Sequence, residues 1–372
     1  MLHTTSRATL IVILLFAFQS GLALPRFASR TGAKCQSCHV NPSGGMLRQA
    51  FGVQYGRETL PVEDWAKEFD IDDFTNVLSK FVGIGADVQT LFFTQQLPDT
   101  GSTKGSAQKN AFFEMQGDLY LNFRLAKHVN IFLNKGLYNG FEVFGLLNIL
   151  PAGGYLKVGK FVPNYGTRLD DHTTFIRTYT GFSPEQGRPE LTGAEIGFSP
   201  GPFSITSGIY NSTDGFGAAQ SNDKAFLGRA EGMFALAENI HLGIGGNVFS
   251  HANSSGLRTD LFGGMGSFSY RNITLFGEAD VIRERQLAST INGVVTYIEG
   301  DVLITSGLEF LVAYDFYDPD VDLKTGVLSR YSIGLDFFPI AGVEVRPVYR
   351  IKRENPVELK NDEFHLLVHF YF

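Results

Sequence analysis

The sequence predicts an all-β fold, a transmembrane antiparallel β-barrel preceded by a small helical or irregular segment. Three observations predict it: the composition, a long series of alternating segments, and an alternating C-terminus that ends on Phe372. The 372 residues include 42 Gly and 34 Phe, an enrichment that suits a barrel better than a helical membrane protein. The formal net charge of -7 argues against a nucleic-acid partner, which favours a basic face.

From about Lys80 onward, apolar and polar residues alternate with a period of two, as in strands that separate two environments. The stretch from Asp118 to Leu125 places its apolar side chains on one face: Leu119, Leu121, Phe123 and Leu125. The stretch from Gly342 to Lys352 repeats the pattern. About fifteen such segments are long enough for the ~9–11 residues of a spanning strand. Because strand numbers are normally even, we predict sixteen strands, with fourteen as the second choice.

The alternation also predicts which charged residues face the lumen: Arg124, Arg229, Glu231, Glu344, Arg346 and Arg350. Longer connections are expected at about 96–110, 161–188, 212–223 and 317–328. Long loops usually face the outside and short turns the periplasm. The stretch from Val162 to Thr174 belongs to the longest of these connections, and we expect it to fold inward and constrict the lumen.

The last strand alternates along its whole length. Its predicted lipid-facing stripe is Phe364, Leu366, Val368, Phe370 and Phe372. A terminal aromatic residue on such a strand resembles the assembly signal of outer-membrane barrels. A last strand of a soluble sandwich is the alternative, but so many long consecutive strands argue against it.

The N-terminus predicts export. Arg7 precedes an apolar core from Ala8 to Phe18, and Gly21-Leu22-Ala23 offers a small-x-small cleavage site. The apolar run is shorter than the ~20 residues that a spanning helix needs. We therefore divide the chain into a signal peptide at 1–23, a small segment at 24–79 and the barrel at 80–372.

The two cysteines of the chain lie together in Cys35-Gln36-Ser37-Cys38-His39, the attachment pattern of a c-type haem. In this pattern two thiols bind the vinyl groups of one covalent haem, and the adjacent histidine becomes the proximal ligand of the iron. Haem attachment requires an exported chain, which the signal peptide independently predicts. A redox-active or disulfide-bonded Cys pair is the main alternative. A zinc site lacks a second Cys pair to complete it.

The distal iron ligand stays open at this stage. Met46 follows His39 by seven residues, beyond two glycines that allow a sharp turn. His172 is a second candidate, although a loop histidine beside Asp170 and Asp171 is the plainer interpretation. The third possibility is a haem iron that has no protein ligand on its distal side.

A signal peptide, one haem motif at Cys35–His39 and a barrel that ends on Phe372 together resemble the fused monohaem cytochrome–porins of iron-oxidising bacteria. The resemblance implies that the haem segment plugs the barrel mouth or lumen. It implies that electrons pass from extracellular ferrous iron to periplasmic c-type cytochromes. It carries over Cys35, Cys38 and His39 as haem-binding residues, and no distal ligand or iron-docking site.

Two functions follow as hypotheses for a protein of the outer membrane, in contact with its lipid. The first is electron transfer between an extracellular donor or acceptor, such as ferrous iron, and a periplasmic c-type cytochrome. The second is a porin whose haem segment is a plug or staple and whose main role is solute passage. Whether the chain is an enzyme stays open: an iron(II)-oxidising role fits, whereas hydrolase or transferase chemistry is not predicted. A peroxidase is disfavoured, since no distal His–Arg pair is identifiable near the motif.

Overall fold

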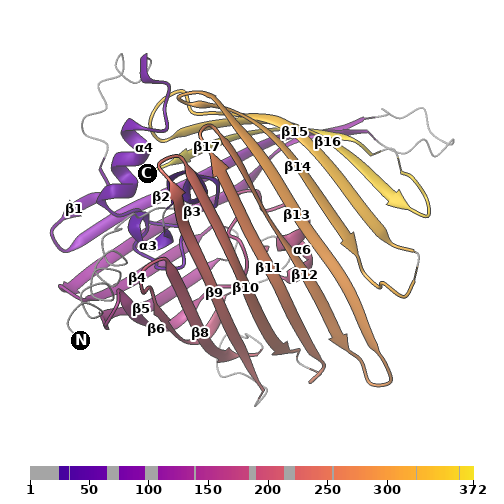
Figure 1. Ribbon diagram of the computed structural model, residues 1–372, viewed down its shortest axis with the longest axis horizontal. Coiled ribbons are helices and arrows are strands. Elements are labelled where there is room, and N and C mark those ends of the chain that lie inside the picture. Colours follow the sequence, from indigo (N-terminus) through magenta and orange to yellow (C-terminus); the bar gives the residue numbers. More distant parts are fainter. Residues whose placement is uncertain are drawn as a thin grey trace, which may run out of the picture.

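Sixteen antiparallel strands close into a barrel in the computed structural model (Figure 1). The structure describes residues 25–32, 34–64, 75–96, 108–137, 140–183, 190–212, 223–253, 255–323, 325–359 and 361–372. The predicted signal peptide lies outside these residues, as do most of the loops expected at 96–110 and 212–223. Among the described residues, no helix is long and apolar enough to cross a membrane.

Each barrel strand pairs with its neighbours in the chain, and β17 pairs with β2 to close the sheet. The strands are β2 (Val82–Gln96), β3 (Gln108–Ala126), β4 (Val129–Gly136), β5 (Phe141–Leu150), β6 (Gly154–Phe161), β7 (Leu191–Phe198), β8 (Phe203–Asn211), β9 (Lys224–Ala237), β10 (Ile240–Ala252), β11 (Arg258–Tyr270), β12 (Ile273–Arg285), β13 (Thr290–Thr305), β14 (Leu308–Asp318), β15 (Val327–Phe337), β16 (Val343–Asn355) and β17 (Glu363–Tyr371). A short strand, β1 (Val77–Ser79), pairs with the start of β2. The prediction of sixteen strands is confirmed.

The final residue completes the closure. The Phe372 N–H donates to the Ala86 carbonyl at 3.1 Å, and the Ala86 N–H donates back at 3.3 Å. This pairing leaves no open sheet edge between the first and last barrel strands, as a membrane-spanning sheet requires. Phe370 and Phe372 are exposed on the outside, as the alternation predicts.

The outer surface of the barrel is apolar and the inner one is largely polar. Leu119, Phe226 and Ile244 are 47%, 50% and 63% exposed on the outside, as lipid-facing residues of a barrel are. The predicted lumen-facing residues Glu344, Arg346 and Arg350 are buried inside. The barrel lumen is therefore filled rather than open along these strands.

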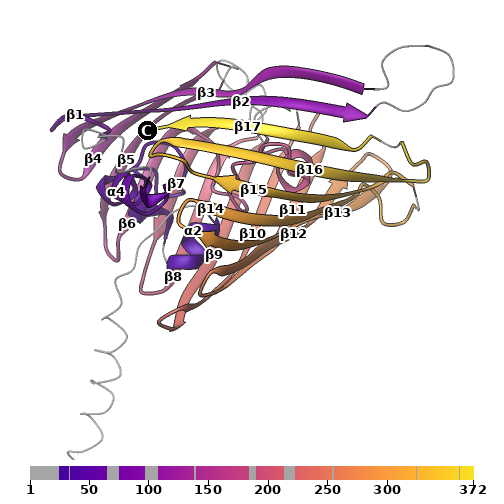
Figure 2. The ribbon, with the colours of Figure 1, turned by 90° about the horizontal axis from the view of Figure 1, so that it is seen from above.

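Two segments enter the lumen, and Figure 2 shows helices of the first at one end of the barrel. The first is the N-terminal plug, which we define as residues 25–62 and which carries α2 (Pro25–Thr31), α3 (Cys35–Cys38) and α4 (Ala50–Glu58). It lies at the end of the barrel where the short turns are: Lys34 Nζ donates to the carbonyls of Ser199 and Phe203 beside the β7–β8 turn, at 3.1 and 2.8 Å. Since short turns usually face the periplasm, we assign this end as the periplasmic mouth.

The second segment is the constriction loop, residues 162–183 after β6, which carries α6 (Phe175–Thr180). Its hydrogen bonds reach the inner wall on the far side of the barrel. Tyr165 Oη donates to Asp280 at 2.7 Å, and the Phe175 N–H donates to Asp315 at 2.8 Å. The predicted inward fold of the stretch from Val162 to Thr174 is confirmed.

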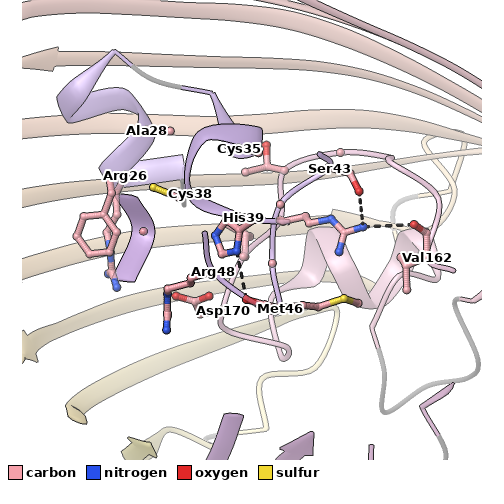
Figure 3. Close-up of a pocket in the computed structure, with 18 of the residues that line it drawn as sticks. Arg26, Ala28, Cys35, Cys38, His39, Ser43, Met46, Arg48, Val162 and Asp170 are labelled. Carbon is pink, nitrogen blue, oxygen red and sulfur yellow. Dashed lines mark hydrogen bonds between the residues drawn. The ribbon is translucent and has the colours of Figure 1, made fainter. Parts of the chain in front are cut away.

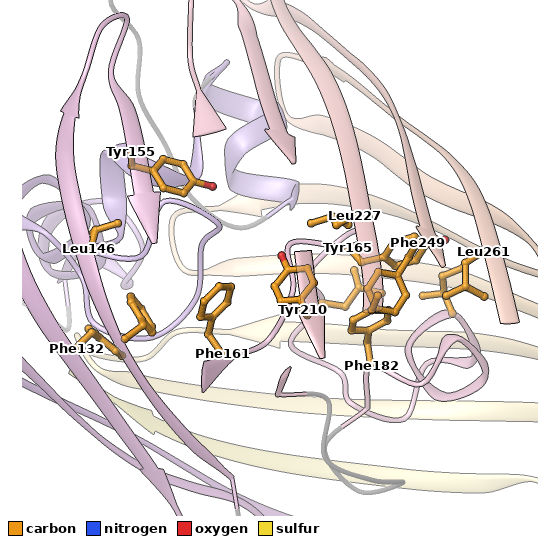
Figure 4. Packing of buried hydrophobic residues seen from close by; sticks show 14 of the residues in the cluster. Phe132, Leu146, Tyr155, Phe161, Tyr165, Phe182, Tyr210, Leu227, Phe249 and Leu261 are labelled. Atoms are coloured by element: carbon orange, nitrogen blue, oxygen red, sulfur yellow. The ribbon is translucent and has the colours of Figure 1, made fainter. Parts of the chain in front are cut away.

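Part of the inner wall is aromatic rather than polar, because the plug and the loop pack against it. Tyr120, Phe132, Phe144, Phe161 and Tyr210 form a belt with successive ring centroids 6.4, 5.1, 5.6 and 5.7 Å apart. Figure 4 shows Phe132, Phe161 and Tyr210 of this belt. Val40 and Leu47 of the plug belong to the same buried cluster, as do Leu169 and Ile176 of the constriction loop. The plug thus shares a hydrophobic core with the barrel.

Ion pairs hold the plug to the part of the barrel wall that lies away from the aromatic belt. Arg26 pairs with Asp336 and lies 3.7 Å from Glu344, and Arg30 pairs with Glu309 at 2.7 Å. The Arg26 and Asp336 side chains are 4% and 0% exposed. These buried pairs lie on β14, β15 and β16, so the plug is held on both sides of the lumen.

Replacing Arg26 by Met is expected to weaken docking of the plug by about 3–5 kcal/mol, because it leaves buried carboxylates without their partner. Hydrogen exchange should then show faster exchange in residues 25–62 than in the barrel strands. Arg57→Met is the matched control: its ion pair with Glu58 is exposed, so the variant should leave the protection of the plug unchanged. Unchanged protection of the plug in Arg26→Met would contradict this account of how the plug is held.

Candidate functional site

The motif Cys35–His39 lies on the short helix α3 and its first following residue. Cys35 and Cys38 occupy one helical turn, and the His39 N–H donates to the Cys35 carbonyl at 3.0 Å. His39 then turns into extended backbone at φ -114° and ψ 146°. The two cysteines are not joined by a disulfide. The backbone therefore presents two thiols and one imidazole together.

A tight turn folds the chain back over this helix. The Ser43 hydroxyl donates to the Asn41 side chain at 2.8 Å, and the Val40 N–H donates to the Leu47 carbonyl at 3.0 Å. Gly44 has φ 85°, in the left-handed region that favours glycine. A Cβ on Gly44 would lie 3.3 Å from the Cys35 sulfur, so glycine also keeps the space beside this thiol clear.

Helix α4 packs closely against α3 through another glycine. A Cβ on Gly52 would lie 2.4 Å from the Cys38 carbonyl oxygen, closer than real contacts allow. The Gln49 N–H donates to the same carbonyl at 2.6 Å. The motif is thus held by the plug's own backbone.

Cys35, Cys38 and His39 line one cavity of about 320 Å³ between the plug, the constriction loop and the barrel wall. This volume falls in the range of small-molecule sites. Barrel residues on the cavity include Asp87, Tyr120, Glu344, His369 and Tyr371. The predicted lumen residues Arg229 and Glu231 also line it.

The His39 ring is oriented by a main-chain contact (Figure 3). Its Nδ1 lies 3.2 Å from the Met46 carbonyl oxygen, to which an Nδ1–H donates. Nε2 then carries the lone pair, the arrangement typical of a metal-binding imidazole with an outer hydrogen bond. Burial lowers the pKa of His39 to about 4, and the charge of Arg48 acts in the same direction. The ring is therefore neutral at pH 7, as a ligand must be.

The pKa of the Cys35 thiol is shifted in the opposite direction, upward. Burial raises the pKa of its thiol to about 11, and the charge of Glu231 adds to this effect. The thiol therefore stays protonated at pH 7 and is a poor nucleophile or exchange partner compared with an activated redox cysteine. The protonated Cys35 thiol therefore argues against a catalytic redox pair at this motif.

The residues present fit a covalently attached c-type haem. Two thiols without a disulfide and a neutral imidazole with its Nε2 unprotonated lie on the same lumen cavity. The haem itself stays a prediction.

Met46, a predicted candidate for the distal ligand, lies beside His39. Its carbonyl is on the Nδ1 side of His39, and its side chain extends away from that ring and packs against the buried cluster (Figure 3). Met46 and His172 both line the cavity. Both residues stay predicted candidates for the distal ligand of the predicted haem.

Solved structures with this fold are porins and channels of outer membranes. OmpT of Vibrio cholerae, folded in vitro and in its trimer form, gives a TM-score of 0.55 at 11% identity, over 78% of this chain and 99% of that one. An anion-selective porin from Comamonas acidovorans gives the same values. The outer membrane channel DcaP of Acinetobacter baumannii gives a TM-score of 0.55 at 11% identity, over 80% and 100%.

The fold is that of an outer-membrane porin. No known family profile matches the sequence, and no curated protein matches it. At this level of identity the similarity concerns the fold, and together with the apolar outer surface it supports placement in an outer membrane. The resemblance to cytochrome–porins in particular stays an expectation.

Several cavity residues on the porin-like wall were not singled out from the sequence. His369 lies between two carboxylates: its Nδ1 is 2.9 Å from Glu344 and its Nε2 is 3.1 Å from Asp87. Tyr120 donates to the same Asp87. The period-two pattern already placed Tyr120 and Glu344 on the lumen side, but no signal in it shows that strands β2, β3, β16 and β17 meet beside the plug.

Proposed function

We propose that this protein transfers single electrons across the outer membrane by means of one haem c attached to the plug through Cys35 and Cys38, with His39 as proximal ligand. The observation that carries the proposal is the convergence of these three side chains on one lumen cavity. Electrons would pass between an extracellular donor or acceptor, for which ferrous iron is one candidate, and a periplasmic c-type cytochrome.

The placement of the plug supports a relay of this kind. The haem would supply reversible one-electron chemistry, while the chain's own residues hold and shield it. A single group cannot cover a hydrocarbon core of ~30 Å, so a partner is needed. The plug lies at the mouth that we assign to the periplasm, where a soluble cytochrome has access.

Solute passage is the second candidate, and the fold similarities support it more directly. The neighbours are porins and a channel, one of them described as anion-selective. The charged lumen suits either function. In this alternative the plug is a staple, and ions or small solutes pass beside it.

External reduction of the haem distinguishes the two functions. Ferrous iron added outside intact cells is expected to reduce the haem of the wild type, seen in a reduced-minus-oxidised spectrum. His39→Ala should abolish this reaction or shift it strongly, because the axial ligand sets the haem potential. The barrel of the variant should remain folded, since its strands bond to one another. A haem that stays oxidised with every external donor, in a protein that conducts ions well, would favour the porin.

A further inference from the structure

Two arginines on the cavity differ from six other arginines of the lumen. Arg26, Arg30, Arg229, Arg330, Arg346 and Arg350 each form an ion pair with a carboxylate. Arg48 and Arg168 form none with any carboxylate among the described residues. Both are half-buried and line the cavity that holds Cys35, Cys38 and His39.

Arg48 forms no ion pair with a carboxylate among the described residues, although two acidic residues lie in its vicinity. Its guanidinium lies 4.3 Å from the centre of the Tyr371 ring, a cation–π contact that leaves N–H donors available. Asp87 is near enough to feel its charge but is already bonded to His369 and Tyr120. Asp170 also lies close by (Figure 3).

Arg168 reaches the same cavity from the constriction loop. Its Nη2 makes two long contacts, 3.5 Å to the Ser43 hydroxyl and 3.3 Å to the Val162 carbonyl. A Cβ on Gly45 would lie 3.6 Å from its Nη1, so Arg168 rests against the turn that follows the haem motif. Ser43 belongs to the plug and Val162 to the loop, so this side chain bridges the two.

We infer that Arg48 and Arg168 form a carboxylate clamp, which binds the two propionate groups of the haem. A half-buried guanidinium without a counter-ion is costly, and a carboxylate on the cavity would satisfy it with charge-assisted hydrogen bonds. The inference rests on the proposed haem. It adds that the haem joins the plug, through Arg48, to the constriction loop, through Arg168.

The reduction potential of the purified, haem-loaded full chain tests the clamp. Removing a cation near the iron favours the ferric form, so Arg48→Gln and Arg168→Gln should each lower the midpoint potential, and the double variant should lower it more. The potential should also become more dependent on pH around neutrality, because propionates without their arginines bind protons more readily. Arg168→Lys keeps the charge and should recover most of the wild-type potential. Arg57→Gln, which removes a partly exposed charge of the plug outside the cavity, is the control.

Two results would overturn the clamp, and they are distinguishable. If the glutamine variants keep covalent haem but share the potential and pH dependence of Arg57→Gln, the clamp is wrong and the haem assignment stands. If the wild type holds no haem, both the clamp and the proposed haem are wrong. In that case a change in the chloride-to-potassium selectivity of Arg48→Gln/Arg168→Gln channels would identify the pair as a site for free anions instead.

Discussion

Replacing Cys35 and Cys38 together by Ala is expected to remove covalent haem completely. The two thiols are the chain's only cysteines, and both line the plug cavity. The denatured wild-type chain should keep haem-dependent peroxidase staining at its mature mass, and the double variant should show none. Loss of external reduction should accompany the loss of haem.

The same variant should leave the barrel assembled. Strands β2 to β17 bond to one another without any contribution from the cysteines. Unheated samples should therefore still migrate differently from boiled ones, as closed barrels do. Ser37→Ala is the matched control, because it changes the same helical turn and keeps both thiols. Haem staining that survives the loss of both cysteines would show that the haem is held in another way.

Deleting the plug, residues 25–62, is expected to raise the ion conductance of the channel several-fold. The plug fills the mouth at the short-turn end and shares the buried cluster through Val40 and Leu47. Its removal leaves the constriction loop as the remaining obstacle, held by Tyr165 and Phe175. Planar-bilayer recordings of the wild type and the deletion variant measure the difference.

The wild-type conductance separates the two functions further. Electron transfer through a closed lumen predicts a low wild-type conductance that increases on deletion. Equal, high conductance in both proteins would show that the plug does not obstruct the pore, and it would favour solute passage.

The sequence predicted the barrel well because alternation has a direct physical cause. A strand between lipid and lumen must change polarity at every residue, so Leu119 and Tyr120 could be assigned to opposite faces before the structure was known. Closure on Phe372 and the even strand number follow from the same constraint. The haem motif also has a fixed spacing that its chemistry requires, but the haem itself stays a prediction.

The cavity wall could not be predicted in the same way. Arg48 and Arg168 are 120 positions apart in the chain and line the same cavity because the constriction loop folds inward. The aromatic belt was also unexpected. Phe132, Phe144 and Phe161 face the lumen because the plug supplies apolar partners there, whereas alternation alone assigns such residues to the lipid side. These features depend on long-range packing, which leaves no local pattern.

The mass of the intact mature chain tests the central claim most directly. Protein purified from outer membranes should have the mass of the chain after removal of the signal peptide plus one haem, and the haem should stay attached after denaturation. Fragmentation should locate it on the peptide that contains Cys35 and Cys38. A mature chain of unmodified mass, with its two cysteines as thiols or a disulfide, would contradict the account and leave a plugged porin.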